Sequence, residues 1–187
     1  MVKSYSLDEI LFCFALASEA ADVFDGQNIL FTGIGKVQAT YALSKILGSQ
    51  RPKLIINLGS AGSSHFPKGT VVNCRQFVQR DMDVRGLGFE QYETPLSGIP
   101  SVLEYGEIFD GLPQAVCGTG DSFEMEQGNT SYTVVDMEAY ALAYIAQQEK
   151  IPFLCLKYIS DGADDNAADD WLEQVHKAAE AYGKLLL

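Results

Sequence analysis

Short apolar segments alternate along this chain with segments in which apolar residues recur every three or four positions. Continuous apolar runs are typical of strands buried on both faces, and the longer spacing is typical of amphipathic helices. The strands predicted in this way are 11–17, 28–32, 54–58, 70–79, 114–118, 132–136 and 153–160. The predicted helices are 36–47, 138–148 and a last one on which Trp171, Val175, Ala178, Tyr182 and Leu186 share one face.

Strands that alternate with helices indicate an α/β sandwich with a central, largely parallel sheet. Ligands of such sheets bind beyond the carboxyl ends of the strands, so residues that follow a strand are candidates for a site. These residues are Glu19, 33–36, 59–62, 120–123 and Asp161. We expect Gly59 to Gly62 to turn sharply after their strand, Gly48 to end the first long helix, and the polar segment 80–100 to be a loop.

The composition narrows the class of protein. No repeat, low-complexity tract or linker divides the chain, and a domain usually has roughly 100–200 residues, so we expect one domain, 1–187.

The 13 Lys and Arg residues against 25 Asp and Glu residues give a net charge of −12. This charge argues against nucleic acid or an anionic membrane surface as partner, because both attract basic faces. No run approaches the roughly 20 apolar residues of a membrane span, and acids near the start argue against an export signal.

The metal-ligating residue types are few. The four cysteines lie in apolar, strand-like runs without a CxxC pair, which favours buried, reduced thiols in a cytoplasmic protein. They are Cys13, Cys74, Cys117 and Cys155. The two histidines are far apart in the sequence, so we expect no zinc site and no other metal.

Two glycine-containing segments follow predicted strands. In Gly33-Ile-Gly35-Lys36, the third glycine of a dinucleotide fingerprint is missing because Gln38 stands there, and the spacing of a phosphate loop is absent as well. By itself this segment indicates a tight turn. The small residues of Gly59-Ser60-Ala61-Gly62 either form an ordinary turn or allow backbone N–H groups to approach a ligand closely.

Two acidic segments allow two interpretations each. Asp136-Met137-Glu138 stands where a strand gives way to a helix, so its acids either cap that helix or accept hydrogen bonds from sugar hydroxyls, with Met137 against the apolar face of the sugar. Ser160-Asp161 closes an apolar strand. Asp161 is either a helix cap or a proton donor whose pKa partial burial raises. The later acids Asp164, Asp165, Asp169 and Asp170 lack calcium-loop spacing and indicate a solvated helix start.

Eight segments taken together carry a family resemblance. They are ALASEA at 15–20, TGIGKVQA at 32–39, LIINLGSAGS at 54–63, GTVVN at 69–73, DMDV at 81–84, GDSF at 120–123, VVDMEA at 134–139 and ISDGAD at 159–164. In this order they resemble the purine nucleoside phosphorylase/hydrolase superfamily, and within it the 5′-methylthioadenosine/S-adenosylhomocysteine nucleosidases. The resemblance implies a three-layer αβα sandwich around a twisted, mostly parallel mixed sheet. It also implies a homodimer that hydrolyses the N-glycosidic bond of a purine nucleoside to free adenine, without cofactor or metal.

Transferred to this sequence, the resemblance implies roles for single residues. Asp161 is the general acid that protonates N7 of the base, held by Ser160, and Glu19 activates the attacking water. The residues implied to bind substrate are Glu138 at the ribose hydroxyls, Met137 against the ribose, Phe123 against the base, and Ser60, Ala61 and Gly62 beside the ribose and the water. Such acid–base help is typically worth ~10²–10⁴-fold in rate. One carboxyl in a drier and one in a wetter environment can divide the two tasks.

Two alternatives stay open at this stage. Phosphorylases of this superfamily hold phosphate with arginines and an N-terminal glycine-aspartate-proline segment. That segment is absent, and the net charge does not attract phosphate, so water is favoured as the nucleophile. A non-catalytic nucleoside-binding protein on the same fold is the second alternative, against which the presence of both Asp161 and Glu138 argues. The 5′ substituent of the substrate is left open.

Overall fold

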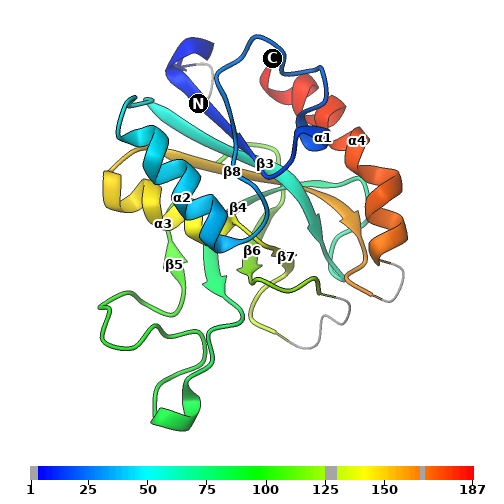
Figure 1. The fold of residues 1–187 in the computed structure, drawn as a ribbon. Coiled ribbons are helices and arrows are strands. Elements are labelled where there is room, and N and C mark those ends of the chain that lie inside the picture. Colours follow the sequence, from blue (N-terminus) through cyan, green and yellow to red (C-terminus); the bar gives the residue numbers. More distant parts are fainter. Residues whose placement is uncertain (1–3, 125–129, 165–166) are drawn as a thin grey trace.

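The computed structural model describes residues 4–124, 130–164 and 167–187. Within these residues, eight strands form one mixed sheet (Figure 1). The strands follow one another in the order β2 (Ile29–Phe31), β1 (Ile10–Phe14), β3 (Leu54–Gly62), β7 (Val134–Asp136), β6 (Gln114–Thr119), β4 (Val71–Gln79) and β5 (Leu103–Glu104), with β8 (Phe153–Asp161) paired to β3 and β4. β1, β2, β3 and β8 run parallel to one another, as do β4, β6 and β7. The two sets meet in the antiparallel pairs β3–β7 and β4–β8.

Helices cover both faces of the sheet. α2 (Lys36–Leu47) and α3 (Ala139–Glu149) lie on one face, and α1 (Ala17–Ala20) and α4 (Ala167–Leu186) lie on the other (Figure 1). Each face has its own apolar core, because successive side chains of a strand point to opposite sides. In β1, Leu11 and Cys13 pack into the core beneath α2 and α3, whereas Phe12 and Phe14 pack into the core beneath α4. The predicted three layers are therefore present.

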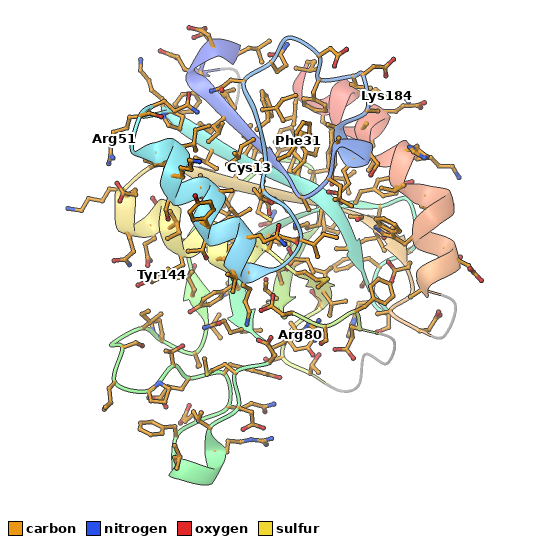
Figure 2. The ribbon with its side chains drawn as sticks, in the orientation of Figure 1. Cys13, Phe31, Arg51, Arg80, Tyr144 and Lys184 are labelled. Atoms are coloured by element: carbon orange, nitrogen blue, oxygen red, sulfur yellow. The ribbon has the colours of Figure 1, made fainter. Side chains whose placement is uncertain are left out.

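Buried and exposed positions follow the expected chemistry. Figure 2 shows Cys13 within the body of the molecule, whereas Arg51 and Lys184 extend from its periphery. All four cysteines are free and buried, as the sequence predicts. The described helices include none with both the length and the apolar character needed to cross a bilayer.

Most of the predicted elements lie within about two residues of the observed ones. α2 spans the predicted range and is followed by Gly48 at its end. The apolar run 11–17 is too long as a strand, because β1 ends at Phe14 and Ala17 already begins α1. The polar segment 80–100 is a loop that projects away from the sheet (Figure 1) and contains one short 3₁₀ turn, Arg85–Leu87.

The prediction of a sharp turn at Gly59 to Gly62 is wrong. These residues continue β3 and stay paired with β8, with Ser60 opposite Tyr158 and Ala61 opposite Ile159. Small side chains are needed here for close approach rather than for turning. A Cβ atom on Gly62 would stand only 2.5 Å from Oδ1 of Asp161.

Candidate active site

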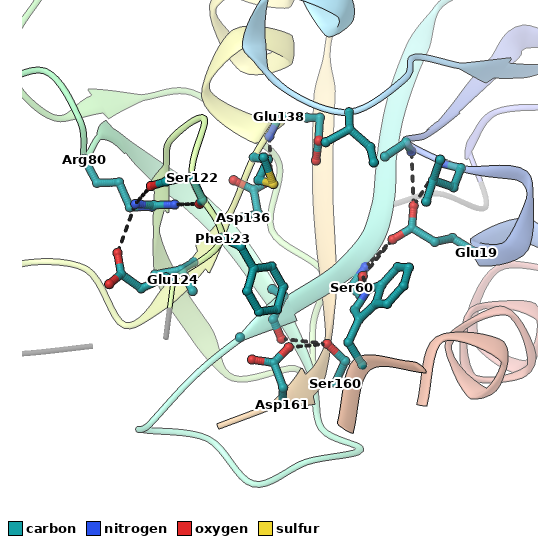
Figure 3. A pocket seen from close by; sticks show the side chains of 18 residues that line it. Glu19, Ser60, Arg80, Ser122, Phe123, Glu124, Asp136, Glu138, Ser160 and Asp161 are labelled. Carbon is teal, nitrogen blue, oxygen red and sulfur yellow. Dashed lines mark hydrogen bonds and ion pairs between the residues drawn. The ribbon is translucent and has the colours of Figure 1, made fainter. Parts of the chain in front are cut away.

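A cavity of about 420 Å³ opens at the end of β3 and β8. Its wall combines segments far apart in the sequence, namely the start of α1, the end of β3, residues 122–124, the junction of β7 and α3, and the end of β8 (Figure 3). All nine residues that the sequence analysis singled out for a site line this one cavity. They are Glu19, Ser60, Ala61, Gly62, Phe123, Met137, Glu138, Ser160 and Asp161. The carboxyl ends of the strands thus meet where the predicted fold requires.

Glu19 lies on α1 and is 3% exposed. Its Oε2 accepts hydrogen bonds from the backbone N–H groups of Ala15 and Leu16, both at 3.2 Å, which are donors that the helix start leaves without a helical partner. Its Oε1 accepts from the backbone N–H of Ser60 at 2.9 Å and from the Ser60 hydroxyl at 2.8 Å. Four donors therefore hold this carboxylate in one orientation on the cavity wall.

Asp161 stands on the opposite side of the cavity at the end of β8 (Figure 3). Its Oδ2 accepts a hydrogen bond from the Ser160 hydroxyl at 2.7 Å, and its Oδ1 accepts from the backbone N–H of Ala163 at 2.9 Å. Burial raises the pKa of Asp161 above its usual value, although both hydrogen bonds oppose the shift. The protonated form is thereby favoured, and a protonated carboxyl can act as an acid.

Glu138 precedes α3 and lines the cavity at a third position, apart from these two carboxyls (Figure 3). The buried backbone N–H of Gly35 donates to its Oε1 at 2.8 Å. Burial, followed by the charge of Asp136, raises the pKa of Glu138 to about 8. A group with this pKa changes its charge within the range in which most enzymes work.

Asp136 also lines the cavity, and its carboxyl caps α3. Its Oδ2 accepts from the backbone N–H of Ala139 at 2.8 Å and contacts the ammonium of Lys157, also at 2.8 Å. Both side chains of this ion pair are almost completely buried. Burial alone would raise the pKa of Asp136, but the charge and hydrogen bond of Lys157 and the bonds from Thr119 and Ala139 outweigh it and lower that pKa. The cap interpretation thus describes Asp136, whereas the side chain of Glu138 makes no cap hydrogen bond.

Sequence reasoning missed Lys157. It stands inside the apolar run of β8, where both neighbouring side chains pack into the core. A lysine is almost never buried without a partner, because its desolvation is costly. The signal was therefore present, since a charge in a fully buried strand requires a buried counter-charge, but the partner Asp136 could not be identified without the fold.

The glycine-containing segment 33–36 connects three parts of the site. The N–H of Gly35 binds Glu138, and Lys36 donates from its backbone N–H to Asp121 at 2.7 Å and from its ammonium to Asp81 at 2.5 Å. The backbone N–H of Asp121 donates to the other oxygen of Asp81 at 2.9 Å. The turn interpretation is thus correct, and the turn joins the DMDV and GDSF segments to the cavity wall.

Arg80 and Trp171 also line the cavity, and neither was predicted as a site residue. Arg80 binds the Ser122 hydroxyl at 3.0 Å and Glu124 at 2.9 Å, and so holds the segment that carries the half-exposed ring of Phe123. Trp171 on α4 donates from Nε1 to the Ser60 hydroxyl oxygen at 2.8 Å. The sequence indicated Trp171 only as a packing residue. Among the described residues, no group of three or more His, Cys, Asp or Glu side chains is arranged to hold a metal ion.

Known proteins resemble this chain in sequence. The family described as "Phosphorylase superfamily" matches residues 26–187. A 5′-methylthioadenosine/S-adenosylhomocysteine nucleosidase of Shewanella piezotolerans is 31% identical, and the match covers 82% of this chain and 76% of that protein. The nucleosidase of Geobacillus kaustophilus is 30% identical, with 85% and 77% covered.

Solved structures have the same fold. The Helicobacter pylori 5′-methylthioadenosine/S-adenosylhomocysteine nucleosidase, in complex with a pyrrolidine inhibitor, superposes with a TM-score of 0.84 at 20% identity and 97% coverage of both chains. A futalosine hydrolase of the same organism gives a TM-score of 0.84 at 20% identity, with 96% of both chains covered. These likenesses confirm the predicted fold class.

Proposed function

The chain belongs to the phosphorylase superfamily, and on that premise we propose that it is an N-glycosyl hydrolase of purine nucleosides. Its substrate is of the 5′-methylthioadenosine or S-adenosylhomocysteine class, and its products are adenine and the ribose moiety. The observation that carries the proposal is that Glu19, Asp161 and Glu138 all line one cavity, each in a different environment. The matches to the Shewanella and Geobacillus nucleosidases extend over more than three quarters of the length of those proteins.

The environments fit the two proton transfers of hydrolysis. When the glycosidic bond breaks, its electron pair moves to the purine, and the sugar becomes positively charged at C1′. A protonated Asp161 gives its proton to the base, and burial favours this protonated form. Glu19 takes a proton from the water whose oxygen bonds to C1′. The step consumes one water, whose OH goes to C1′ and whose proton goes to Glu19. Glu19 then releases this proton to solvent, and Asp161 takes one up from solvent, so both groups return to their starting states.

Glu138 is proposed to bind the ribose hydroxyls. Its carboxyl faces the cavity, and the Gly35 N–H fixes one of its oxygens. An ionised carboxylate accepts hydrogen bonds from two neighbouring hydroxyls more strongly than a neutral group does. Met137 and Phe123, which line the same cavity, supply apolar contact to the sugar and the base.

The experiment that tests the function is base release from a panel of nucleosides. Adenosine, methylthioadenosine, adenosylhomocysteine, inosine and deoxyadenosine are each incubated with the protein, with and without phosphate. We expect adenine to be released from the 5′-thio nucleosides at the same rate in both conditions. A strict phosphate requirement would identify a phosphorylase, and binding of nucleosides without any release would identify a binding protein.

A homodimer belongs to the same proposal. Val37 and Tyr41 on α2 are 78% and 67% exposed, and Ile34, which lines the cavity, is 47% exposed. A second copy covering this apolar surface beside the cavity would remove it from water. Sedimentation should give about twice the 20.4 kDa chain mass, and Val37→Glu should shift the protein towards the monomer.

We also propose a cytoplasmic location. The four buried thiols are free, and free thiols persist in reducing compartments. Fractionation of cells that express the natural chain tests this, since recovery from an oxidising compartment would contradict it.

A further inference from the structure

One face of α4 is connected to the cavity by more than apolar packing. Trp171, Val175, Ala178 and Tyr182 recur along this helix at intervals of three and four residues and face the sheet. Val175 and Ala178, in the middle of the row, are buried apolar contacts. At the ends of the row, however, polar atoms bond two neighbouring residues of β3, which packing does not require. Trp171 bonds Ser60, and Tyr182 bonds Gly59.

The bond at one end of the row sets the direction of a proton. The indole N–H of Trp171 can only donate, and it donates to the Ser60 hydroxyl oxygen at 2.8 Å. The single proton of Ser60 is therefore directed to the other neighbour of its oxygen, Oε1 of Glu19, which also lies at 2.8 Å. The chain of donors runs in one direction, from Trp171 through Ser60 to Glu19.

The bonds at the other end hold the backbone. The fully buried hydroxyl of Tyr182 has two acceptors within reach, the carbonyl oxygen of Gly59 at 2.8 Å and that of Leu156 on β8 at 3.2 Å, and it accepts from the Gly59 N–H at 3.3 Å. Gly59 faces Glu19 so closely that a Cβ there would stand 3.2 Å from Oε1. The next residue, Ser60, donates its backbone N–H to the same Oε1 at 2.9 Å. Tyr182 thus fixes the strand at the distance from which Ser60 reaches the carboxylate.

We propose that α4 positions the general base, with Trp171 and Tyr182 as positioning residues that act on Glu19 through Ser60 and Gly59. This inference rests on the proposed hydrolysis. The proposal gives a functional reason for the two aromatic residues at the ends of the row, which sequence periodicity explains only as packing. Without these bonds, the Ser60 hydroxyl can rotate, and the carboxylate loses a fixed orientation towards the water.

The test compares single and double variants with methylthioadenosine as substrate. Trp171→Phe keeps an aromatic ring and loses the N–H, so we expect kcat to fall about 5–10-fold with KM changed less than about 2-fold, the worth of one hydrogen bond to an ionised network. The kcat of Ser60→Ala should fall at least as far. Because Trp171 acts through Ser60, the double variant should be no slower than Ser60→Ala alone. Tyr182→Phe should lower kcat about 3–10-fold.

A matched control uses another tyrosine that binds α4. Tyr158 lies opposite Ser60 in the sheet, but its hydroxyl donates to Gln174 on this helix, and no hydrogen bond joins that hydroxyl to Ser60 or Glu19 in the described part of the chain. Tyr158→Phe therefore also loses one hydroxyl bond to α4 and should keep the wild-type kcat. Equal losses in Tyr158→Phe and Tyr182→Phe would assign both tyrosines to helix packing.

An optical readout tests the Trp171–Ser60 bond without catalysis. Trp171 is the single tryptophan of the sequence, so Ser60→Ala should shift the emission of the folded protein. A wild-type kcat in Trp171→Phe would overturn the inference. So would a double variant whose loss in kcat equals the product of the losses in the two single variants. Should Trp171→Phe unfold, the emission shift and the Tyr182→Phe kinetics decide the question. Absence of base release by the wild type would instead contradict the proposed function.

Discussion

At the scale of single residues, three carboxyl groups around one cavity differ in what surrounds them. Glu19 accepts four hydrogen bonds from N–H and O–H donors, whereas Asp161 accepts two and has a raised pKa because it is buried. Glu138 has a single backbone donor and a pKa of about 8. Under the proposed function, burial and the number of donors prepare the same chemical group for three tasks.

Replacement of Asp161 by Asn should remove the acid and keep the shape of the site. We expect kcat to fall at least ~10²-fold, because an amide cannot give a proton to the leaving base. The dissociation constant of adenine, measured through the fluorescence emission of Trp171, should change less than a few-fold. Turnover near the wild-type rate would exclude Asp161 as the acid.

The charge of Glu138 should be visible in the pH dependence of substrate binding. Its pKa of about 8 means that the carboxyl is mostly neutral at pH 7 and mostly ionised at pH 9. Because the ionised form accepts ribose hydroxyls better, KM for methylthioadenosine should fall as pH rises from 7 to 9. Glu138→Gln should abolish this dependence while leaving the affinity for free adenine unchanged. A KM for this variant that still falls over the same range would assign the titration to another group.

At the scale of elements, the end of β3 stays in the sheet and still serves the site. Its small residues let Asp161 from β8 and Glu19 from α1 approach the backbone closely. Glycines at these positions are usually taken as turn signals, but here hydrogen bonding to β8 decides the conformation. The turn at 33–36 has a comparable connecting role, because Lys36 links Asp81 and Asp121.

A methyl group on Gly62 should disturb catalysis more than folding. The new Cβ would lie 2.5 Å from Oδ1 of Asp161, closer than atoms can approach, so the carboxyl must move from its bond with Ala163. We expect Gly62→Ala to lower kcat at least ~10-fold, since displacements of this size cost about that much or more. Gly86→Ala is the control, because no atom lies within 4 Å of the added Cβ. Equal activity of both variants would contradict the close approach as a requirement.

At the scale of the whole molecule, two parallel sets of strands meet in antiparallel pairs, and a buried ion pair lies at their junction. Lys157 belongs to β8 and Asp136 to β7, which are not neighbours in the sheet. The pair connects the half of the sheet that carries Asp161 with the half that carries Glu138. Its ammonium also lowers the pKa of Glu138 against the effects of burial and of Asp136.

Removal of the ammonium should destabilise the protein strongly. Lys157→Met leaves the Asp136 carboxylate buried without its counter-charge, so we expect a loss of about 3–5 kcal/mol in the free energy of unfolding. The double variant Lys157→Met/Asp136→Asn should recover part of this loss. Lys53→Met, which breaks an exposed pair with Glu9, should cost less than about 1 kcal/mol. Denaturant unfolding measures all three, and equal losses for the buried and the exposed pair would contradict the argument.

Much of the fold and of the cavity wall could be predicted from the sequence alone. The apolar runs and the three-to-four spacing identify β3, β8, α2 and α4, because burial of side chains imposes these periods whatever the neighbour is. Residues that follow parallel strands must meet at one edge of the sheet. For this reason Glu19 and Asp161 could be placed at one site without coordinates. Glu138 follows β7, which runs antiparallel to β3, and only the family resemblance assigned it to the same site.

The sequence by itself thus determined the layers, the order of the elements and nine of the side chains at the cavity. Only the tertiary structure decided which of these side chains are partners. Lys157 with Asp136, Trp171 with Ser60, and Gly35 with Glu138 are each separated by 21 or more positions in the sequence. Periodicity reports that a side chain is buried, but hydrogen bonds and ion pairs depend on distances of about 3 Å. Distances of that order are fixed only when the sheet and its helices pack together.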